Sequence, residues 1–140
     1  KYLKLEDPPT PQKITRVIEA TNGTMGIFGG LGGAFLFEEL RRGAIGTMTG
    51  FAYPEVLVAI HKYMASGDPE RARAIFYKWI PLIRYENSTG ISVAIRKEIM
   101  KRRGFITTAD VRPPSPPIDD STREELDDLM NALDLSIENL

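Results

Sequence analysis

The sequence of 140 residues predicts an α/β protein in which a short parallel β-sheet is followed by a helical region. Two observations support this prediction. Strand-like apolar segments alternate with helical patterns as far as Thr49, and such alternation is typical of βαβ units and a parallel sheet. From Tyr53 onward, proline, acidic residues and glycine mark the start or end of one helix after another. We therefore expect two parts, residues 1–52 and residues 53–140.

The first part contains three expected strands and two expected helices. These are a strand over 2–6, a helix over 10–21, a strand over 24–30, a helix over 34–42 and a strand over 44–49. Thr10 followed by Pro11 predicts an N-cap with proline at the first helical position. Ile14, Val17 and Ile18 then form one apolar stripe.

The second part contains four expected helices. One begins at Pro54 and ends at Gly67, the next begins after Asp68, a third covers 91–103, and a last one begins at Ser121. We expect Val93, Ile95 and Ile99 to be buried by the third helix. The proline-rich segment 112–117 before the last helix is expected to be extended.

Composition limits the functions that this chain can perform. The net charge is −1, which gives no electrostatic reason to expect nucleic acid or a membrane surface as a partner. There are no cysteines, which fits a reducing, cytoplasmic compartment. His61 is the only histidine, so a Ser-His-Asp triad or a His-rich metal site is not expected, and no metal or cofactor is predicted. His61 itself is expected on a helix surface.

Lys4 is the strongest candidate for a catalytic residue in this sequence. Alternation in the first strand places Leu3 and Leu5 on one face and Lys4 on the other. A buried lysine has a pKa below its usual value of about 10.4, and the free amine can then form a Schiff base with a carbonyl compound. The alternative is a solvated lysine on an edge strand. Position alone leaves both interpretations open.

The predicted sheet is too small to form a domain of its own. Three strands do not close a barrel, and an open parallel sheet has two exposed edges. The chain also opens without methionine, inside a strand. From these observations we expect this chain to be the C-terminal part of a larger protein.

Four segments resemble, in the same order, the dihydrodipicolinate synthase and N-acetylneuraminate lyase family. They are residues 3–9 (LKLEDPP), 29–33 (GGLGG), 43–47 (GAIGT) and 68–73 (DPERAR). The resemblance implies a (β/α)₈ TIM barrel with a C-terminal helical extension, usually as a homotetramer. The chain would then hold barrel strands six to eight. Because such a barrel needs about 250 residues, the N-terminal half of the barrel would be missing here.

The resemblance also implies the site residues. Lys4 matches the Schiff-base lysine, and Gly30 matches a glycine whose backbone faces the substrate. Ile45 matches an isoleucine whose backbone lies beside the pyruvate part of the adduct, and Thr47 falls where sialic acid lyases have a substrate-binding serine. The same lyases have acidic residues where this chain has Gly32 and Gly33, a departure that disfavours a long polyol substrate. Barrel core remains an alternative role for Ile45, as does an ordinary strand position for Thr47.

Next to Lys4, two acidic residues have two possible roles. Glu6 and Asp7 are candidates for an acid–base pair, or for capping the turn before Pro8 and Pro9.

The function implied is that of a class I lyase or aldolase, which joins pyruvate or another 2-oxo acid to an aldehyde or cleaves the product. The first alternative is a 2-keto-3-deoxy sugar acid aldolase or dehydratase of the same family. An alternative of another class is a noncatalytic helical binding or assembly module, with residues 113–117 offered to an aromatic groove. Because family motifs from the first half of the barrel are not present, we expect the isolated chain to be inactive. The second substrate and the direction of reaction do not follow from the sequence.

Overall fold

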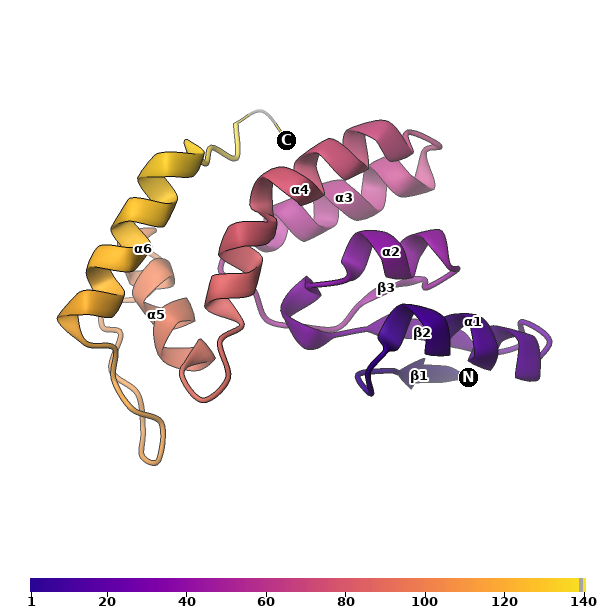
Figure 1. The fold of residues 1–140 in the computed structure, drawn as a ribbon, viewed down its shortest axis with the longest axis horizontal. Coiled ribbons are helices and arrows are strands. Elements are labelled where there is room, and N and C mark those ends of the chain that lie inside the picture. The colour runs from indigo at the N-terminus through magenta and orange to yellow at the C-terminus, as the bar shows by residue number, and fades with distance from the viewer. Residues whose placement is uncertain (139) are drawn as a thin grey trace.

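The computed structural model describes residues 1–138 and 140, and within them a three-stranded sheet is joined to six α-helices (Figure 1). The elements of the β/α part are β1 (Tyr2–Lys4), α1 (Thr10–Ala20), β2 (Gly26–Gly29), the 3₁₀ turn η1 (Leu31–Gly33), α2 (Leu36–Arg41) and β3 (Gly46–Thr47). The helices that follow are α3 (Pro54–Ala65), α4 (Pro69–Glu86), α5 (Ser92–Arg102) and α6 (Asp120–Leu133). The predicted order of strands and helices is therefore confirmed, with shorter strands than expected.

The sheet is parallel, as the alternation of strands and helices predicts. Its strand order is β1-β2-β3, with Leu3 opposite Ile27 and Phe28 opposite Gly46. Among the described residues, β1 and β3 each pair with β2 alone, so both are edge strands. In a parallel sheet all strands end at the same edge, which brings the segments after Lys4, Gly29 and Thr47 to one side of the molecule.

A small apolar core lies between the sheet and α1. Leu5, Ile14, Ile27 and Ala44 are buried there, and Val17 and Ile18 pack against them. The apolar stripe predicted for the first helix is thus confirmed. Leu3 was expected on the same buried face but remains 37% exposed, because it lies on the edge strand.

Thr10 does not cap the first helix. Pro9 occupies the N-cap position, and Thr10 is the first helical residue. The Thr10 hydroxyl instead donates a hydrogen bond of 2.6 Å to Oε1 of Glu39, and both residues are buried. The capping prediction was wrong because a buried carboxyl group without a donor costs more free energy than an uncapped helix end in water.

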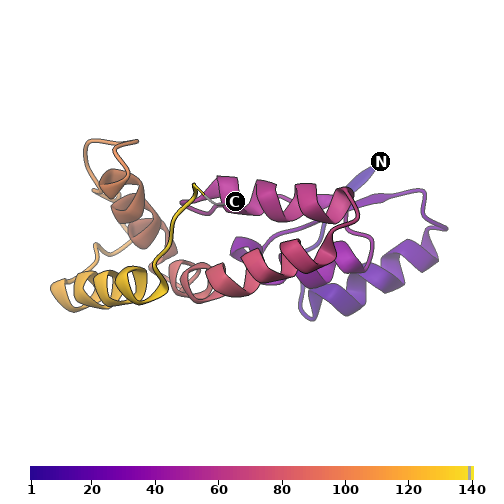
Figure 2. The ribbon, with the colours of Figure 1, turned by 90° about the horizontal axis from the view of Figure 1, so that it is seen from above.

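A larger core connects the β/α part with the helices. Leu36 and Phe37 of α2 belong to the same apolar cluster as the buried residues of α3, α4 and α5. At its centre the rings of Tyr53 and Trp79 lie 4.8 Å apart. Figures 1 and 2 show α3 and α4 side by side, with α5 and α6 at the end of the molecule away from the sheet. The boundary between residues 52 and 53 stays a prediction, since this core spans it.

Two details of the helical part differ from expectation. Val93 is 48% exposed, and Ala94 takes the buried position beside Ile95. The last helix is capped by Asp119, whose carboxylate accepts the N–H of Thr122, and not by Ser121. Residues 93 and 95 are two positions apart and lie on nearly opposite sides of a helix, so Val93 does not share the buried face of Ile95 and Ile99. The N-cap of the last helix lies two residues before Ser121.

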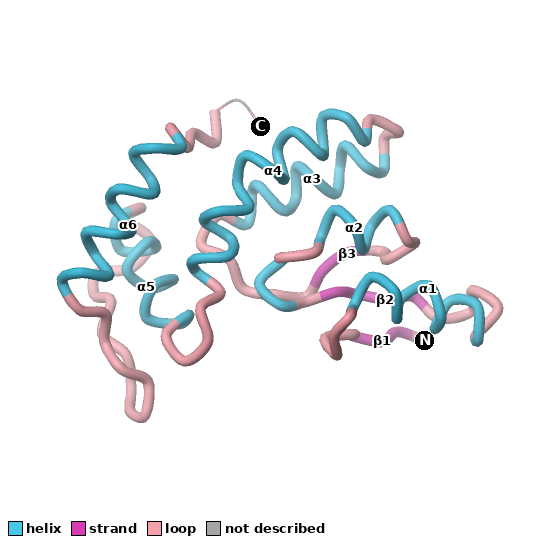
Figure 3. Tube along the Cα trace, viewed as in Figure 1, coloured by secondary structure: helices cyan, strands magenta, loops and turns pink. Residues whose placement is uncertain are grey.

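Two further features concern proline. α4 continues past Pro81 to its end. Residues 103–119, which include the proline-rich segment, form neither helix nor strand (Figure 3). No helix among residues 1–138 has the length and apolar character needed to cross a bilayer.

Candidate functional site

Lys4 is the last residue of β1 and lies at the carboxyl end of the sheet. Its side chain is 37% exposed. The low-dielectric surroundings predicted for this lysine are therefore not provided by the described residues. The reason is that β1 is an edge strand, so the face of the sheet that carries Tyr2 and Lys4 is open.

Glu6 connects Lys4 to the glycine-rich turn. Its Oε2 lies 3.0 Å from Nζ of Lys4, and its Oε1 accepts a hydrogen bond of 3.0 Å from the N–H of Leu31. The Leu31 N–H and, after it, the Lys4 ammonium hold the pKa of Glu6 below its usual value. Glu6 is therefore a carboxylate at neutral pH and is in direct contact with the Lys4 amine.

Asp7 does not share this arrangement. Its carboxylate forms an ion pair with Lys13 of α1 on the surface. The acid–base pair that the sequence suggested for Glu6 and Asp7 is not formed, because the two side chains point to different partners. The turn-capping alternative is not what Glu6 does either, since it bonds to a residue 25 positions away.

Gly30 leaves room for Glu6. Gly30 is buried, and a Cβ atom at this position would overlap the Glu6 carboxylate. Its φ of −162° is ordinary extended backbone, so space alone requires glycine here. The positive φ expected of this turn belongs to Leu31, Gly32 and Gly33, with φ of 49°, 68° and 84°.

Glu39 is a buried acid that sequence reasoning missed. It lies on α2 with no exposed surface, its Oε1 accepts from Thr10, and its Oε2 has no hydrogen-bond partner among the described residues. Burial raises its pKa above the usual value. Its carboxylate fills the space beside Gly29, on the strand next to Lys4. The signal was visible, since Glu38 and Glu39 interrupt an apolar helix.

Ile45 and Thr47 lie on the far strand of the sheet. The Ile45 carbonyl is 3.1 Å from Nε2 of His61, which is on the exposed surface of α3 as predicted. The Thr47 hydroxyl is buried without a hydrogen-bond partner in the described part of the chain. Thr47 also lines a hollow of about 350 Å³ with Phe28 and Leu57. No hydrogen bond or ion pair among the described residues joins either residue to Lys4.

The end of α4 reaches the same edge of the sheet, which the sequence did not predict. The buried Glu86 accepts the N–H of Ala52 at 2.9 Å and pairs with Nε of Arg96 at 2.6 Å. Asn87 donates from Nδ2 to the carbonyl of Leu31 at 3.0 Å. The helical part therefore holds the segments that follow β2 and β3.

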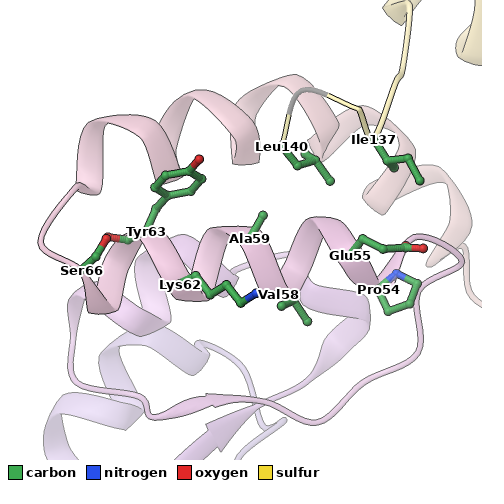
Figure 4. A pocket seen from close by; sticks show the side chains of 9 residues that line it. All are labelled: Pro54, Glu55, Val58, Ala59, Lys62, Tyr63, Ser66, Ile137 and Leu140. Carbon is green, nitrogen blue, oxygen red and sulfur yellow. The ribbon is translucent and has the colours of Figure 1, made fainter.

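A second hollow lies away from Lys4. It is a groove of about 750 Å³ between one face of α3 and residues Ile137 and Leu140 (Figure 4). Its lining includes none of Lys4, Gly30, Ile45 or Thr47. Within residues 1–138 and 140, no cluster of histidine and acidic side chains is suited to hold a metal ion.

Comparison with known proteins identifies the family. Residues 10–133 match the Dihydrodipicolinate synthetase family, which is most of the chain. The chain belongs to this family. A crystal structure of dihydrodipicolinate synthase from Rhodopseudomonas palustris matches 93% of the chain with a TM-score of 0.85 and 37% sequence identity. The three-stranded parallel sheet with its helices is consistent with part of the barrel of this family.

Two further proteins are similar to the chain. An L-2-keto-3-deoxyarabonate dehydratase from Azospirillum brasilense is 32% identical over 135 residues, or 95% of the chain. The crystal structure of dihydrodipicolinate synthase from Oceanobacillus iheyensis matches 95% of the chain with a TM-score of 0.81 at 21% identity, which supports the fold alone. The chain spans 43% to 46% of the length of these three relatives.

Proposed function

We propose that Lys4 is the Schiff-base lysine of a class I lyase that acts on pyruvate or another 2-oxo acid. The observation that carries this proposal is the contact of 3.0 Å between Lys4 and Glu6 at the carboxyl end of β1. Barrel enzymes have their active sites at this end of the strands. Membership of the dihydrodipicolinate synthetase family supports a lyase of this class.

Glu6 would move the protons that imine formation requires. As a carboxylate, it takes a proton from the Lys4 ammonium, and the free amine then attacks C2 of the 2-oxo acid. One proton passes from nitrogen to the former carbonyl oxygen. Glu6 returns its own proton to the hydroxyl of the carbinolamine, which leaves as water, and the protonated imine remains. Loss of a proton from C3 then gives an enamine, which adds to an aldehyde.

The other predicted site residues would bind this adduct. The Ile45 N–H donates to Ile27 at 2.8 Å, and the Ile45 carbonyl lies 3.1 Å from Nε2 of His61. Contact with the substrate would therefore use the second lone pair of this carbonyl oxygen. The unpaired Thr47 hydroxyl would donate to a substrate oxygen. Gly30 would present its backbone to the substrate.

The proposed setting is a (β/α)₈ barrel in which β1, β2 and β3 are strands six to eight. The unpaired edges of β1 and β3 among the described residues support this setting, and so does the chain's match to less than half of each relative. Barrel closure would also bury Lys4, and Schiff-base chemistry would use its free amine. A homotetramer in the cytoplasm completes the proposal. The isolated chain is expected to be inactive, because it holds only part of the site.

A dehydratase for a 2-keto-3-deoxy sugar acid is the second candidate. Its reaction would pass through the same imine and enamine as the aldolase reaction. The hydroxyl at C4 of the sugar acid would then leave as water. Glu6 favours this candidate, because an acid beside the imine can protonate the departing hydroxyl. The 32% identity to the A. brasilense dehydratase supports it as well.

Borohydride reduction tests the proposed nucleophile. Full-length protein treated with pyruvate and borohydride should gain a stable adduct on Lys4, detected by mass spectrometry of peptides. Lys4→Arg should gain none, and Lys13→Arg, which changes a lysine on α1, should react like wild type. An adduct elsewhere, or none at all, would defeat the proposal and leave the noncatalytic module as the better interpretation.

Substrate panels separate the two reactions. We expect the full-length protein either to condense pyruvate with an aldehyde or to remove water from 2-keto-3-deoxyarabonate. Chromatography of the products identifies which reaction occurs. The isolated 140-residue chain, assayed in parallel, should show no turnover. Turnover comparable with the full-length protein would contradict the incomplete site proposed for this chain.

A further inference from the structure

Leu31 has an unusual backbone at the centre of the glycine turn. Its φ is 49°, in the left-handed region that residues with a Cβ atom rarely adopt. Three glycines surround it in residues 30–33, yet Leu31 itself carries a side chain. Such a conformation persists only when neighbouring contacts hold it.

Two side chains from distant parts of the chain hold this residue. The Leu31 N–H donates to Glu6 at 3.0 Å, and the Leu31 carbonyl accepts from Nδ2 of Asn87 at 3.0 Å. Both polar groups of Leu31 are therefore used, one towards Lys4 and the other towards the end of α4. Asn87, Leu31, Glu6 and Lys4 form one continuous polar chain.

Gly32 shows how closely Asn87 is fitted to the turn. The φ of Gly32 is 68°, and a Cβ atom there would lie 2.7 Å from Cγ of Asn87. The amide group of Asn87 thus packs on the backbone of the turn while it donates to Leu31. A residue that only ended α4 would not need this contact.

We propose that Asn87 is a positioning residue for Lys4. It holds Leu31 in the left-handed conformation, so that the Leu31 N–H keeps the Glu6 carboxylate against the Lys4 amine. The proposal rests on the function proposed above. It assigns to the helical part of the chain a role in the reactivity of the lysine.

Variants of Asn87 test this role in the full-length protein. Asn87→Asp keeps the shape but loses the donor, and Asn87→Ala removes the side chain. A misplaced catalytic group costs about 10- to 100-fold in rate, so we expect kcat and the rate of borohydride trapping to fall by about this factor. KM for the 2-oxo acid should change far less than kcat. Asn131→Asp on the exposed surface of α6 is the matched control and should behave like wild type.

Rescue distinguishes positioning from a contribution to stability. Glycine adopts positive φ freely, so Leu31→Gly should restore part of the trapping rate in the Asn87→Ala background, although it restores no hydrogen bond. Gly32→Ala should slow trapping as Asn87→Ala does, because its Cβ displaces the amide. Gly23→Ala has the same φ of 68° with nothing within 4 Å of the added atom, and should not slow trapping.

The outcomes are separable. Slow trapping in both Asn87 variants with rescue by Leu31→Gly supports the proposal. Wild-type trapping in both variants overturns it, and so does a loss of rate that Leu31→Gly does not repair. Where Asn87→Ala melts below the assay temperature, the comparison of Gly32→Ala with Gly23→Ala decides in the same way. No adduct on Lys4 in wild-type protein would instead refute the function on which the proposal rests.

Discussion

The hydroxyl of Thr10 donates a hydrogen bond of 2.6 Å to Oε1 of Glu39, and this pair joins the start of α1 to the neighbouring helix α2. Both side chains are buried. Glu39 has no exposed surface, and its other oxygen has no donor among the described residues, so Thr10 supplies the hydrogen bond that makes burial of this acid tolerable. The pair therefore fixes the first helix of the β/α part by a polar contact as well as by its apolar stripe.

Removal of the Thr10 hydroxyl should destabilise the protein. In Thr10→Val, Oε1 of Glu39 loses its donor and neither carboxylate oxygen then has a partner among the described residues. An unsatisfied buried polar group costs about 1–3 kcal/mol of the free energy of unfolding. Thr10→Ser keeps the hydroxyl and should lose much less. Urea denaturation of both variants measures the difference, and equal stability of the two would show that the hydrogen bond contributes nothing.

Glu39→Gln should change how stability depends on pH. Burial raises the pKa of Glu39 in the folded protein above its usual value of 4.5. The folded state then holds the proton more tightly than the unfolded state, so stability is full below pH 4.5 and falls as pH rises towards the folded pKa. Glutamine does not titrate. The free energy of unfolding of Glu39→Gln, relative to wild type, should therefore increase as pH rises above 4.5. Urea denaturation of both proteins from about pH 4 to about pH 8 measures this difference, and a difference that does not change with pH would contradict the prediction.

The ion pair between the buried Glu86 and the partly exposed Arg96 should be strongly coupled. Arg96→Ala leaves the Glu86 carboxylate buried without its cation, and loss of one partner of a buried pair costs about 3 kcal/mol. The double variant Glu86→Gln/Arg96→Ala should recover part of this loss. Arg84→Ala, at an exposed position of the same region, should cost about 0.5 kcal/mol or less. Additive effects in the double-mutant cycle would show that the pair is not coupled.

Local patterns predict much of this fold. The spacing of Ile14, Val17 and Ile18 places the apolar face of α1 correctly, because helical periodicity is a property of neighbouring residues. The glycines at 23, 43 and 67 all have positive φ at the ends of helices, as their positions suggest. The resemblance to a family adds the order of strands, which periodicity alone does not supply.

The candidate site is less predictable because it depends on contacts between distant residues. Sequence alone predicts an exposed position for Glu39, whereas in the structure it is buried and accepts a hydrogen bond from Thr10 of α1. The contact of Glu6 with Leu31 spans 25 positions, and that of Asn87 spans 56. The burial expected for Lys4 is wrong for the described chain, because burial of an edge strand depends on whatever covers its open side. Each of these contacts belongs to the tertiary structure; only Glu39 leaves a local signal, because Glu38 and Glu39 interrupt an apolar helix.

Glu6→Gln should separate the two acidic residues that follow Lys4. Glutamine cannot exchange a proton with the lysine, and loss of general acid–base catalysis costs about 10²- to 10⁴-fold in kcat. Asp7→Asn breaks only the exposed contact with Lys13, and such pairs contribute about 0–1 kcal/mol to stability. We therefore expect Asp7→Asn to keep wild-type turnover in the full-length protein. Equal losses in the two variants would show that Glu6 has no special role.

Gly30→Ala and Gly29→Ala should act on different properties of the protein. The added Cβ at residue 30 meets the end of the Glu6 side chain, which is 42% exposed and can swing away. Stability should change little, while turnover and borohydride trapping fall by about 10- to 100-fold because Glu6 leaves Lys4.

At residue 29 the added Cβ meets the carboxylate of Glu39, which is fully buried and has no space to move. Overpacking of this kind costs about 1–3 kcal/mol, so Gly29→Ala should lower the melting temperature. Thermal melts and trapping rates on both variants check the contrast. A Gly30→Ala protein with a lowered melting temperature and a wild-type rate of pyruvate trapping would contradict this prediction. It would show that Gly30 is needed for the packing of the turn and not for the position of Glu6.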